Sequence, residues 1–222
     1  MPDPTTRQHW LKVYADKDPT AVSWYQPVPD RSLSLISAAA ASAAHRTGAD
    51  STGPFRIIDI GGGASTLVDH LSPQPGVEVC VVDVAAAALA HAKNRLGAEG
   101  ASRVRFVEAD ITGPLESIAD HWADLWHDRA VFHFLTMPDA RLAYAQNLAR
   151  VLAPGGTAII ATFAPDGPEK CSGLPVCRHD GASIAAELSR SGRVFTLVSE
   201  QREDHVTPWG STQRFVYATL KG

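Results

Sequence analysis

The sequence predicts an α/β fold in which a mostly parallel sheet carries helices on both faces. Three observations support this prediction. From Phe55 onward, short β-branched apolar runs alternate with helical segments. The runs are apolar at consecutive positions, as a sheet buried on both faces requires. The last two runs follow one another without a helix between them, so the final strand should be antiparallel to its neighbour.

Each predicted element follows from a local pattern. Seven strands are expected at the apolar runs 56–60, 77–82, 104–108, 123–126, 157–162, 194–200 and 213–220. Helices are expected at 66–71, 85–96, 139–152 and 181–191, the last one between Asp180 and Gly192. Residues 201–212 are too few and too polar for a helical crossover, so they are expected to join the last two strands directly.

One more helix is expected before the first strand. Asp30 is a favourable N-cap residue, the alanine-rich stretch 38–44 has high helix propensity, and Gly48 is a favourable stop. Residues 47–54 are expected to be a linker. The whole chain, 1–222, is expected to form a single domain, because its length fits one α/β domain.

Composition narrows the class of protein. Hydrophobic residues make up 45% of the chain and charged residues 20%, so a buried core is expected. The net charge is −4 and no run of Lys or Arg stands out, which argues against nucleic acid or an anionic membrane as a partner. The start, MPDPTTRQHW, has no secretory pattern, and no apolar run is long enough to cross a bilayer. The 3 cysteines suit a cytoplasmic protein, and the oligomeric state is left open.

A glycine-rich turn follows the first predicted strand, in the sequence IIDIGGGAS at 57–65. Glycines let the backbone turn tightly and approach a ligand, and the helix that follows offers free N–H groups. The residues of the turn expected to contact a ligand are Gly61, Gly62, Gly63 and Ser65. A nicotinamide dinucleotide site would place a glycine at position 66, which is Thr66. The carboxylate of Asp59 before the turn is also unsuited to a phosphate, so a dinucleotide is disfavoured.

Two further acidic residues follow the next two predicted strands. Asp83, with Val84 next to it, is placed to accept hydrogen bonds from ribose hydroxyls, as in Rossmann-like sites. Asp83 could also cap the helix at 85–96. Asp110 and Ile111 follow the third strand, where an exposed loop aspartate would be an alternative interpretation. Acids at three neighbouring strand ends favour a binding site.

In this order the motifs resemble those of class I S-adenosylmethionine-dependent methyltransferases. The chain has the D-x-G-x-G-x-S form at 59–65, and at 152–156 it has the L-x-P-G-G pattern of that class, where a capped helix end and a tight turn are expected. The resemblance covers residues 55 to about 163. It implies a Rossmann-like fold and S-adenosylmethionine as cofactor. It further implies that Asp59 holds the ammonium of the methionine moiety, Asp110 accepts from the adenine amino group, and Ile111 packs on the adenine.

Polar residues crowd the end of the fourth predicted strand, where a fold of this class places the methyl group and its acceptor. The segment WHDR at 126–129 resembles the W-D-R segment of thiopurine methyltransferases, with His127 inserted. The resemblance implies that Arg129 lies at the cofactor and substrate pocket, although a local ion pair with Asp128 would also explain both residues. His127, Asp128 and His133 are the candidate general bases, and His133 could instead be a buried histidine on a helix.

Two segments are expected to cover the site. Residues 1–30 carry aromatic side chains that resemble a lid of the thiopurine methyltransferases, with core packing as the alternative. Those expected to contact the cofactor are Trp10, Tyr14 and Trp24. Residues 164–180 have the Gly, Pro and Cys content of a substrate loop. Cys171, Cys177 and His179 are too few ligands for a metal site, so none is expected.

The sequence therefore predicts an enzyme that transfers the methyl group of S-adenosylmethionine to a small-molecule nucleophile by in-line displacement. A general base is needed only if the acceptor atom is protonated at the working pH. A protein-lysine methyltransferase and a non-catalytic S-adenosylmethionine-binding module are the alternatives. An NAD-linked oxidoreductase is disfavoured by Thr66 and by the antiparallel ending.

Overall fold

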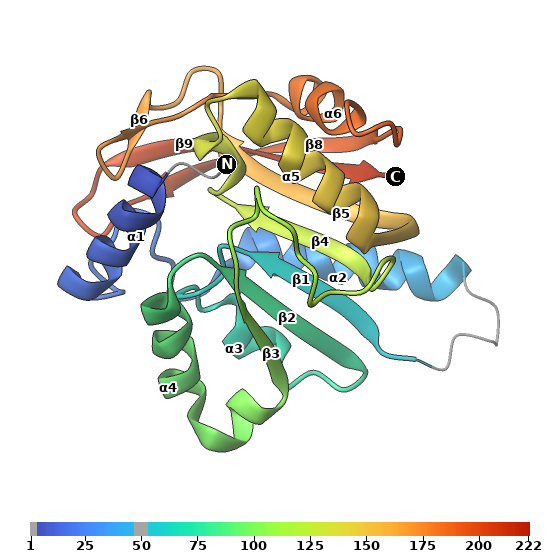
Figure 1. Cartoon of the computed structure of the whole chain (residues 1–222), viewed down its shortest axis with the longest axis horizontal. Helices are drawn as coiled ribbons and strands as arrows, with labels where there is room; N and C mark the ends of the chain where they lie inside the picture. The colour runs from blue at the N-terminus through green and yellow to red at the C-terminus, as the bar shows by residue number, and fades with distance from the viewer. Residues whose placement is uncertain (1–3, 47–52) are drawn as a thin grey trace.

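The computed structural model of the chain describes residues 4–46 and 53–222, and its centre is a seven-stranded sheet with the order β3-β2-β1-β4-β5-β9-β8 (Figure 1). The strands are β1 (Phe55–Ile60), β2 (Val77–Asp83), β3 (Val104–Glu108), β4 (Ala123–Arg129), β5 (Leu152–Phe163), β8 (Thr196–Val206) and β9 (Thr212–Lys221). A separate ribbon pairs β6 (Lys170–Cys171) with β7 (Leu174–Pro175). Strands β1 to β5 are parallel and β9 is antiparallel to β5 and β8, which confirms the predicted fold class.

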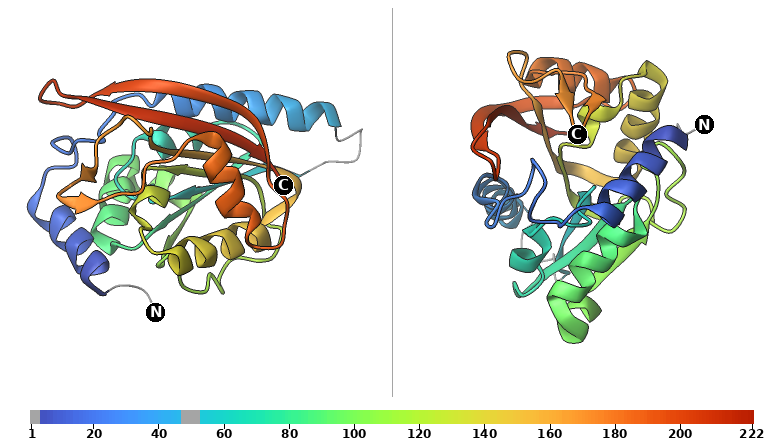
Figure 2. Two further views of the ribbon diagram at one scale, coloured as in Figure 1. Left: turned by 90° about the horizontal axis from the view of Figure 1, so that it is seen from above. Right: turned by 90° about the vertical axis from the view of Figure 1, so that its left-hand side faces the viewer.

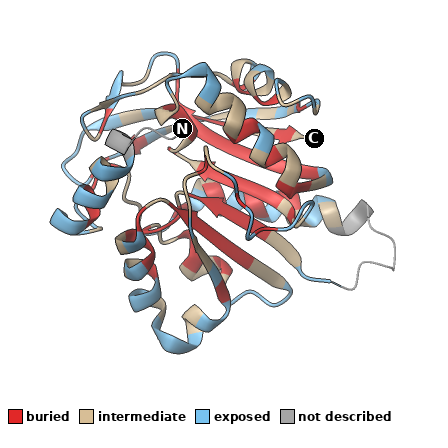
Figure 3. Cartoon of the chain, viewed as in Figure 1, coloured by how far each residue is buried: buried red, intermediate tan, exposed pale blue. Residues whose placement is uncertain are grey.

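Helices cover both faces of the sheet (Figure 2). They are α1 (Pro4–Asp16), α2 (Asp30–Arg46), α3 (Leu67–Leu71), α4 (Ala86–Ser102), α5 (Pro138–Val151) and α6 (Gly181–Ser189), with a short 3₁₀ turn η1 (Phe132–Phe134). One apolar core packs α2, α3 and α4 against the sheet, and a second packs α5 and α6 against the opposite face. The central strands are buried and the outer helix faces are exposed (Figure 3). In the part of the chain that the structure describes, no helix has the length and apolar character needed to cross a membrane.

The carboxyl ends of the parallel strands meet at one edge of the sheet. Ile60 at the end of β1 is in register with Val82 on β2 and with Asp128 on β4. Asp83 at the end of β2 is in register with Glu108 at the end of β3. The loops that follow these strands therefore start side by side, and this edge is where the acidic residues singled out in the sequence come together.

Some boundaries differ from those expected. Strand β4 runs on to Arg129 instead of ending at residue 126, because its polar end still pairs with β1 and β5. The pattern at 152–156 lies at the start of β5, whereas a capped helix end followed by a separate turn was expected. Within it, Gly155 has φ +70° and its N–H donates to the carbonyl of Gly222. Strand β8 reaches Val206, so much of the expected connection is strand. Gly48 and most of the expected linker lie outside the described residues.

The N-terminal part of the chain passes over the same edge of the sheet. Helix α1 packs beside α4. An apolar cluster joins Trp10 and Tyr14 of α1 to Ala85 and Ala88 at the N-terminal end of α4. Residues 22–26, called the strap below, follow α1 and precede α2. The side chain of Trp24 in the strap packs against the same cluster.

Candidate active site

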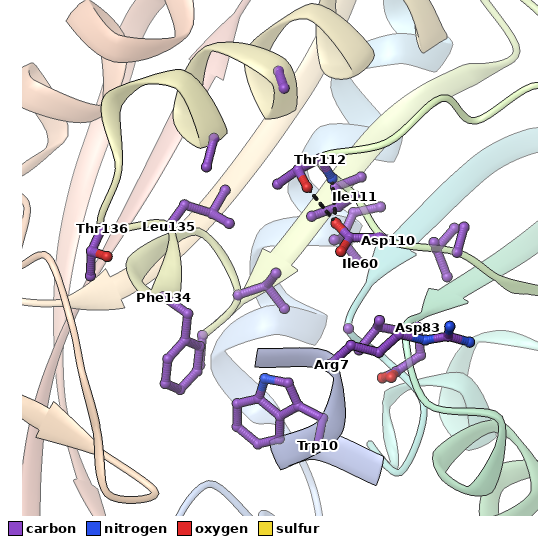
Figure 4. A pocket seen from close by; sticks show the side chains of 18 of the residues that line it. Arg7, Trp10, Ile60, Asp83, Asp110, Ile111, Thr112, Phe134, Leu135 and Thr136 are labelled. Atoms are coloured by element: carbon purple, nitrogen blue, oxygen red, sulfur yellow. Dashed lines mark hydrogen bonds between the residues drawn. The ribbon is translucent and has the colours of Figure 1, made fainter. Parts of the chain in front are cut away.

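A cavity of about 450 Å³ opens at the carboxyl edge of the sheet (Figure 4). Its floor is formed by the ends of β1, β2 and β4 and by the loop after β3. Helix α1 and the strap form one wall, and residues from η1 to the first turns of α5 form another. The cavity is large enough for a nucleoside-sized ligand together with a second small molecule.

The glycine turn after β1 has the geometry of a ligand cradle. Gly61 has φ +66°, and a Cβ atom built on it would lie 2.1 Å from a methyl group of Val131. A Cβ atom on Gly62 would lie 2.1 Å from Oδ2 of Asp59. Gly61 lines the main cavity, both glycines line a smaller cavity beside it, and Gly63 lines neither. Any side chain at Gly61 or Gly62 would therefore occupy the space that the turn leaves open.

Asp83 points into the main cavity from the end of β2 (Figure 4). Its Oδ1 accepts from the backbone N–H of Ala85 at 2.9 Å, and its Oδ2 accepts from Gly63 N–H at 3.1 Å. Burial raises the pKa of this carboxyl to about 6, and the two backbone hydrogen bonds oppose the rise. Asp83 thus faces the cavity and also accepts a hydrogen bond from the backbone at the start of α4. Ribose binding and helix capping, the two interpretations from the sequence, are therefore compatible. Val84 also lines the cavity.

Asp110 and Ile111 line the cavity from the loop after β3 (Figure 4). The backbone N–H and the hydroxyl of Thr112 both donate to Oδ1 of Asp110, at 2.8 Å and 2.6 Å. These bonds fix the carboxylate and leave Oδ2 available to a ligand. Ile111 is nearly buried beside it and offers an apolar surface.

Asp59 lies behind the glycine turn, where β1 is in register with β4 so that its neighbour is His127. Its Oδ1 lies 2.7 Å from Nδ1 of His127, whose Nε2 lies 2.9 Å from the hydroxyl oxygen of Ser32 on α2. Its Oδ2 is buried and has no hydrogen-bond partner. Asp59, His127 and Ser65 line the smaller cavity, of about 40 Å³, and not the main one.

Arg129 is the cation that lies between the two cavities, since it lines both. Its Nε donates to the hydroxyl of Tyr217 and its Nη1 donates to the carbonyl of Trp24, both at 2.9 Å. The guanidinium also stacks over the ring of Phe215, with 4.7 Å from Cζ to the ring centroid. The inserted His127 therefore does not turn Arg129 away from the cavity.

Asp128 and His133 lie behind the cavity wall and do not line it. Asp128 is fully buried and accepts from the backbone N–H groups of Val131 and Phe132 and from the hydroxyl of Tyr144. His133 is also fully buried, and its Nδ1 accepts from Phe163 N–H at 3.3 Å. Burial lowers the pKa of His133 to about 3, so the ring is neutral. Both positions support the local backbone, and the expectation that they act as general bases is not supported by their placement.

Aromatic rings gather at the wall that faces Asp83 and Asp110. Trp10 meets Trp24 and Phe134 edge to face, with ring centroids 5.6 Å and 5.0 Å apart. Tyr14 is buried beneath them and lines the cavity, and its pKa is raised by burial. The N-terminal aromatic residues named from the sequence are thus brought to the cavity.

Several lining residues were not expected from the sequence. They include Arg7, Thr112, Phe134, Leu135 and Thr136 (Figure 4), and also Met137. Phe134 to Met137 could have been found from their position, because they follow the polar end of β4, where the next loop must line the cavity. Ser32 was missed because its partner, His127, is 95 residues away in the chain.

The loop expected at 164–180 reaches the cavity through Cys171, which is buried there on β6. Burial raises the pKa of its thiol to about 11, so the thiol is neutral at physiological pH. Cys177 lies outside the lining, near the guanidinium of Arg141. Within the described residues, no group of three or more His, Cys, Asp or Glu side chains is arranged to hold a metal ion.

Residues 58–158 match the family model described as a methyltransferase domain. Among curated proteins, the ubiquinone/menaquinone biosynthesis C-methyltransferase of Coxiella burnetii is 34% identical over 113 residues, which are 49% of this chain and 43% of that protein. The chain spans less than half the length of the curated relatives it matches.

Solved structures share the fold over almost the whole chain. The 1,6-didemethyltoxoflavin-N1-methyltransferase of Burkholderia thailandensis is 23% identical, covers 97% of this chain and 86% of its own, and has a TM-score of 0.62. The N-methyltransferase NodS of Bradyrhizobium japonicum is 17% identical, covers 99% of both chains, and has a TM-score of 0.64. The sheet order, the strand-end acids and these comparisons agree. Residues 58–158 are similar to a methyltransferase domain, and the fold over nearly the whole chain is the one shared by class I S-adenosylmethionine-dependent methyltransferases.

Proposed function

We propose that the protein transfers the methyl group of S-adenosylmethionine to a small-molecule acceptor with a largely apolar body. The observation that carries this proposal is the division of the cavity into two parts. One part is lined by the strand-end acids Asp83 and Asp110. The other, called the acceptor part below, is lined by residues 129–131 and 134–137 together with Trp10, Trp24 and Cys171.

The acidic part fits the adenosine of the cofactor. The carboxylate of Asp83 would accept from the ribose hydroxyls, and the free oxygen of Asp110 would accept from the adenine amino group, with Ile111 against the ring. The cradle at Gly61 and Gly62 would admit the methionine moiety, whose ammonium group would meet the buried, unpartnered Oδ2 of Asp59. When bound, the cofactor supplies a methyl group that its own sulfonium charge has activated.

The acceptor part is apolar apart from one charge. Trp10, Phe134, Leu135 and Met137 offer broad apolar surfaces, and Arg129 provides the cation. No carboxylate or imidazole occurs among the described residues that line this part. The remaining carboxylate of the lining, Asp139, is exposed on the first turn of α5.

This lining suits an acceptor atom that is already nucleophilic at neutral pH, such as a thiolate, a carboxylate, an aromatic nitrogen or an acidic phenol. The chain's own contribution would be to align the acceptor with the methyl group and to exclude water. A protein lysine would bring a cation toward Arg129 and would require a base to deprotonate it. Both points favour a small molecule over the lysine alternative.

A methyl-transfer screen tests the proposal. The protein is incubated with tritiated-methyl S-adenosylmethionine and either a low-molecular-weight metabolite extract or a protein lysate. We expect label in small, extractable products and none in protein. The matched control is Asp110→Asn, which removes one acceptor from the adenosine part and should lower labelling. Labelling confined to protein would overturn the small-molecule assignment, and absence of labelling in both fractions would overturn the activity.

A further inference from the structure

A buried chain of hydrogen bonds connects three elements behind the glycine turn. The hydroxyl of Ser32 on α2 pairs with Nε2 of His127 on β4 at 2.9 Å, and Nδ1 of His127 pairs with Oδ1 of Asp59 on β1 at 2.7 Å. The three residues are 1%, 2% and 2% exposed. All three line the smaller cavity of about 40 Å³, together with Gly61 and Gly62.

The chemistry of the three groups fixes the direction of the chain. The Asp59 carboxylate can only accept, so Nδ1–H of His127 donates to it. In a neutral ring, Nε2 is then the acceptor for the hydroxyl of Ser32. The ring is held at both nitrogens and cannot rotate without losing a bond. The orientation of the Asp59 carboxylate is fixed as a consequence, because its Oδ1 accepts from a ring that is itself hydrogen-bonded at both nitrogens.

The other carboxylate oxygen has no partner. Oδ2 of Asp59 is buried without a hydrogen bond, and it faces Gly62 so closely that a Cβ there would lie 2.1 Å away. A buried acceptor without a donor is unfavourable, and nearly all such groups in native proteins find one. The smaller cavity has room for a small polar group, since a single water needs about 10–15 Å³.

We propose that Ser32 and His127 are positioning residues of the cofactor site, which hold the Asp59 carboxylate so that Oδ2 accepts a hydrogen bond from the α-ammonium group of S-adenosylmethionine. The inference rests on the proposed function. The two residues act on the cofactor through Asp59, and their effect is restricted to the amino-acid end of the cofactor. The adenosine end is held separately, by Asp83 and Asp110.

The rival interpretation is that the chain only fastens α2 to the sheet. A fastening role would change the stability of the fold and would weaken all ligands of the cavity alike. A positioning role weakens a ligand only if that ligand carries the ammonium group. S-adenosylhomocysteine carries it, whereas 5′-methylthioadenosine has the same adenosine and thioether and lacks the amino-acid moiety.

Calorimetry with these two nucleosides separates the roles. For His127→Ala we expect the affinity for S-adenosylhomocysteine to fall about tenfold or more, because a hydrogen bond to a charged group loses its geometry. The affinity for 5′-methylthioadenosine should change by less than about twofold. His127→Asn, which can place an amide N–H near the position of Nδ1, should recover part of the loss. Ser32→Ala should give a smaller loss of the same selective kind.

Tyr144→Phe is the matched control. Tyr144 is also fully buried, and its hydroxyl bonds to Asp128 in the opposite core, away from both cavities. It should lower stability while leaving the ratio of the two affinities unchanged. Equal losses for both nucleosides in His127→Ala, or no loss for either, would overturn the inference. A parent protein that binds neither nucleoside would instead overturn the proposed function on which it rests.

Discussion

Asp83 shows how one side chain can be both a local structural residue and a ligand-binding residue. Its carboxylate accepts from two backbone N–H groups, at Gly63 and Ala85, and still faces the main cavity. Burial raises its pKa to about 6 in spite of these donors. The charge on this residue therefore changes within the range of pH in which binding is ordinarily measured.

We expect the affinity for S-adenosylhomocysteine to depend on pH through Asp83. The ionised carboxylate is the better acceptor for ribose hydroxyls, so affinity should be constant above about pH 7 and should fall as pH drops through about 6. One proton is linked, so the limit is about tenfold per pH unit. Asp83→Asn should bind more weakly, by about 1–3 kcal/mol, and should lose this pH dependence. Calorimetry between pH 5 and 8 tests this, and a profile that persists in Asp83→Asn would assign it to another group.

Arg129 is expected to support turnover through its fixed geometry. It bonds Tyr217 and the Trp24 carbonyl at once and stacks on Phe215, which a lysine ammonium cannot reproduce. With any acceptor that the screen identifies, Arg129→Ala and Arg129→Lys should both lower kcat/KM by about tenfold or more. Steady-state kinetics on folded variants measures this. Two variants that work like the parent would make Arg129 a structural residue only.

At the scale of elements, the N-terminal segment consists of two parts that are held in different ways. The strap is fixed through its backbone: the carbonyls of residues 23, 24 and 26 accept from His205, Arg129 and Thr66. Helix α1 is held mainly by side chains: Arg7 forms an exposed ion pair with Glu108 at 2.8 Å, the ring of Trp10 contacts Trp24 and Phe134, and Tyr14 packs in an apolar cluster beside α4. The ion pair contributes about 0–1 kcal/mol, and the strap has three backbone hydrogen bonds to the rest of the domain, so we expect α1 to be the more easily displaced part.

Hydrogen exchange should separate these two parts. We expect S-adenosylhomocysteine to slow amide exchange strongly in α1 and only slightly in the strap, because the strap is already hydrogen-bonded before the ligand arrives. Arg7→Ala should speed exchange in α1 of the free protein while changing ligand affinity by less than about fivefold. Mass spectrometry of peptides from both parts gives the rates. Similar protection of α1 and the strap would contradict this division.

The elements predicted from sequence were those with strong local patterns. All seven strands of the main sheet were expected, because each has a short apolar run, in most of them rich in β-branched residues, at the expected place in the alternation with helices. The helix α1 was not expected as such, since Pro4–Asp16 lacks a clear apolar stripe. The length of β8 was underestimated because it is an edge strand whose polar residues, such as Arg202 and Asp204, face solvent.

The sequence could predict those residues of the candidate site that lie at the carboxyl ends of the parallel strands. Asp83, Asp110 and Arg129 were placed at the cavity because the ends of parallel strands must meet. The same argument could not distinguish Arg129 from Asp128, since adjacent strand residues point to opposite faces of the sheet. Ser32 could not be found at all, because only the packing of α2 on the sheet brings it to His127.

At the scale of the whole molecule, ligand binding should be visible as thermal stabilisation. A ligand that binds only the folded state at 100 times its Kd adds about 2.7 kcal/mol, which for a domain of this size raises Tm by about 5–10 °C. We expect this shift with S-adenosylhomocysteine and none with NAD, because Asp59 and Thr66 occupy the turn that a dinucleotide would need. Differential scanning calorimetry tests both. A shift with NAD alone would remove the chain from the methyltransferase class.

The hydrogen bonds of the strap have a consequence for how this segment tolerates change. Its carbonyl oxygens, and not its side chains, make the bonds to His205, Arg129 and Thr66. Replacing Tyr25 or Gln26 by another residue would leave all three acceptors in place. Deleting or inserting one residue would misalign at least one acceptor with its donor and would move Trp24 out of the cavity wall. The segment should therefore tolerate substitutions at these positions, whereas a change in its length would disturb the cavity wall.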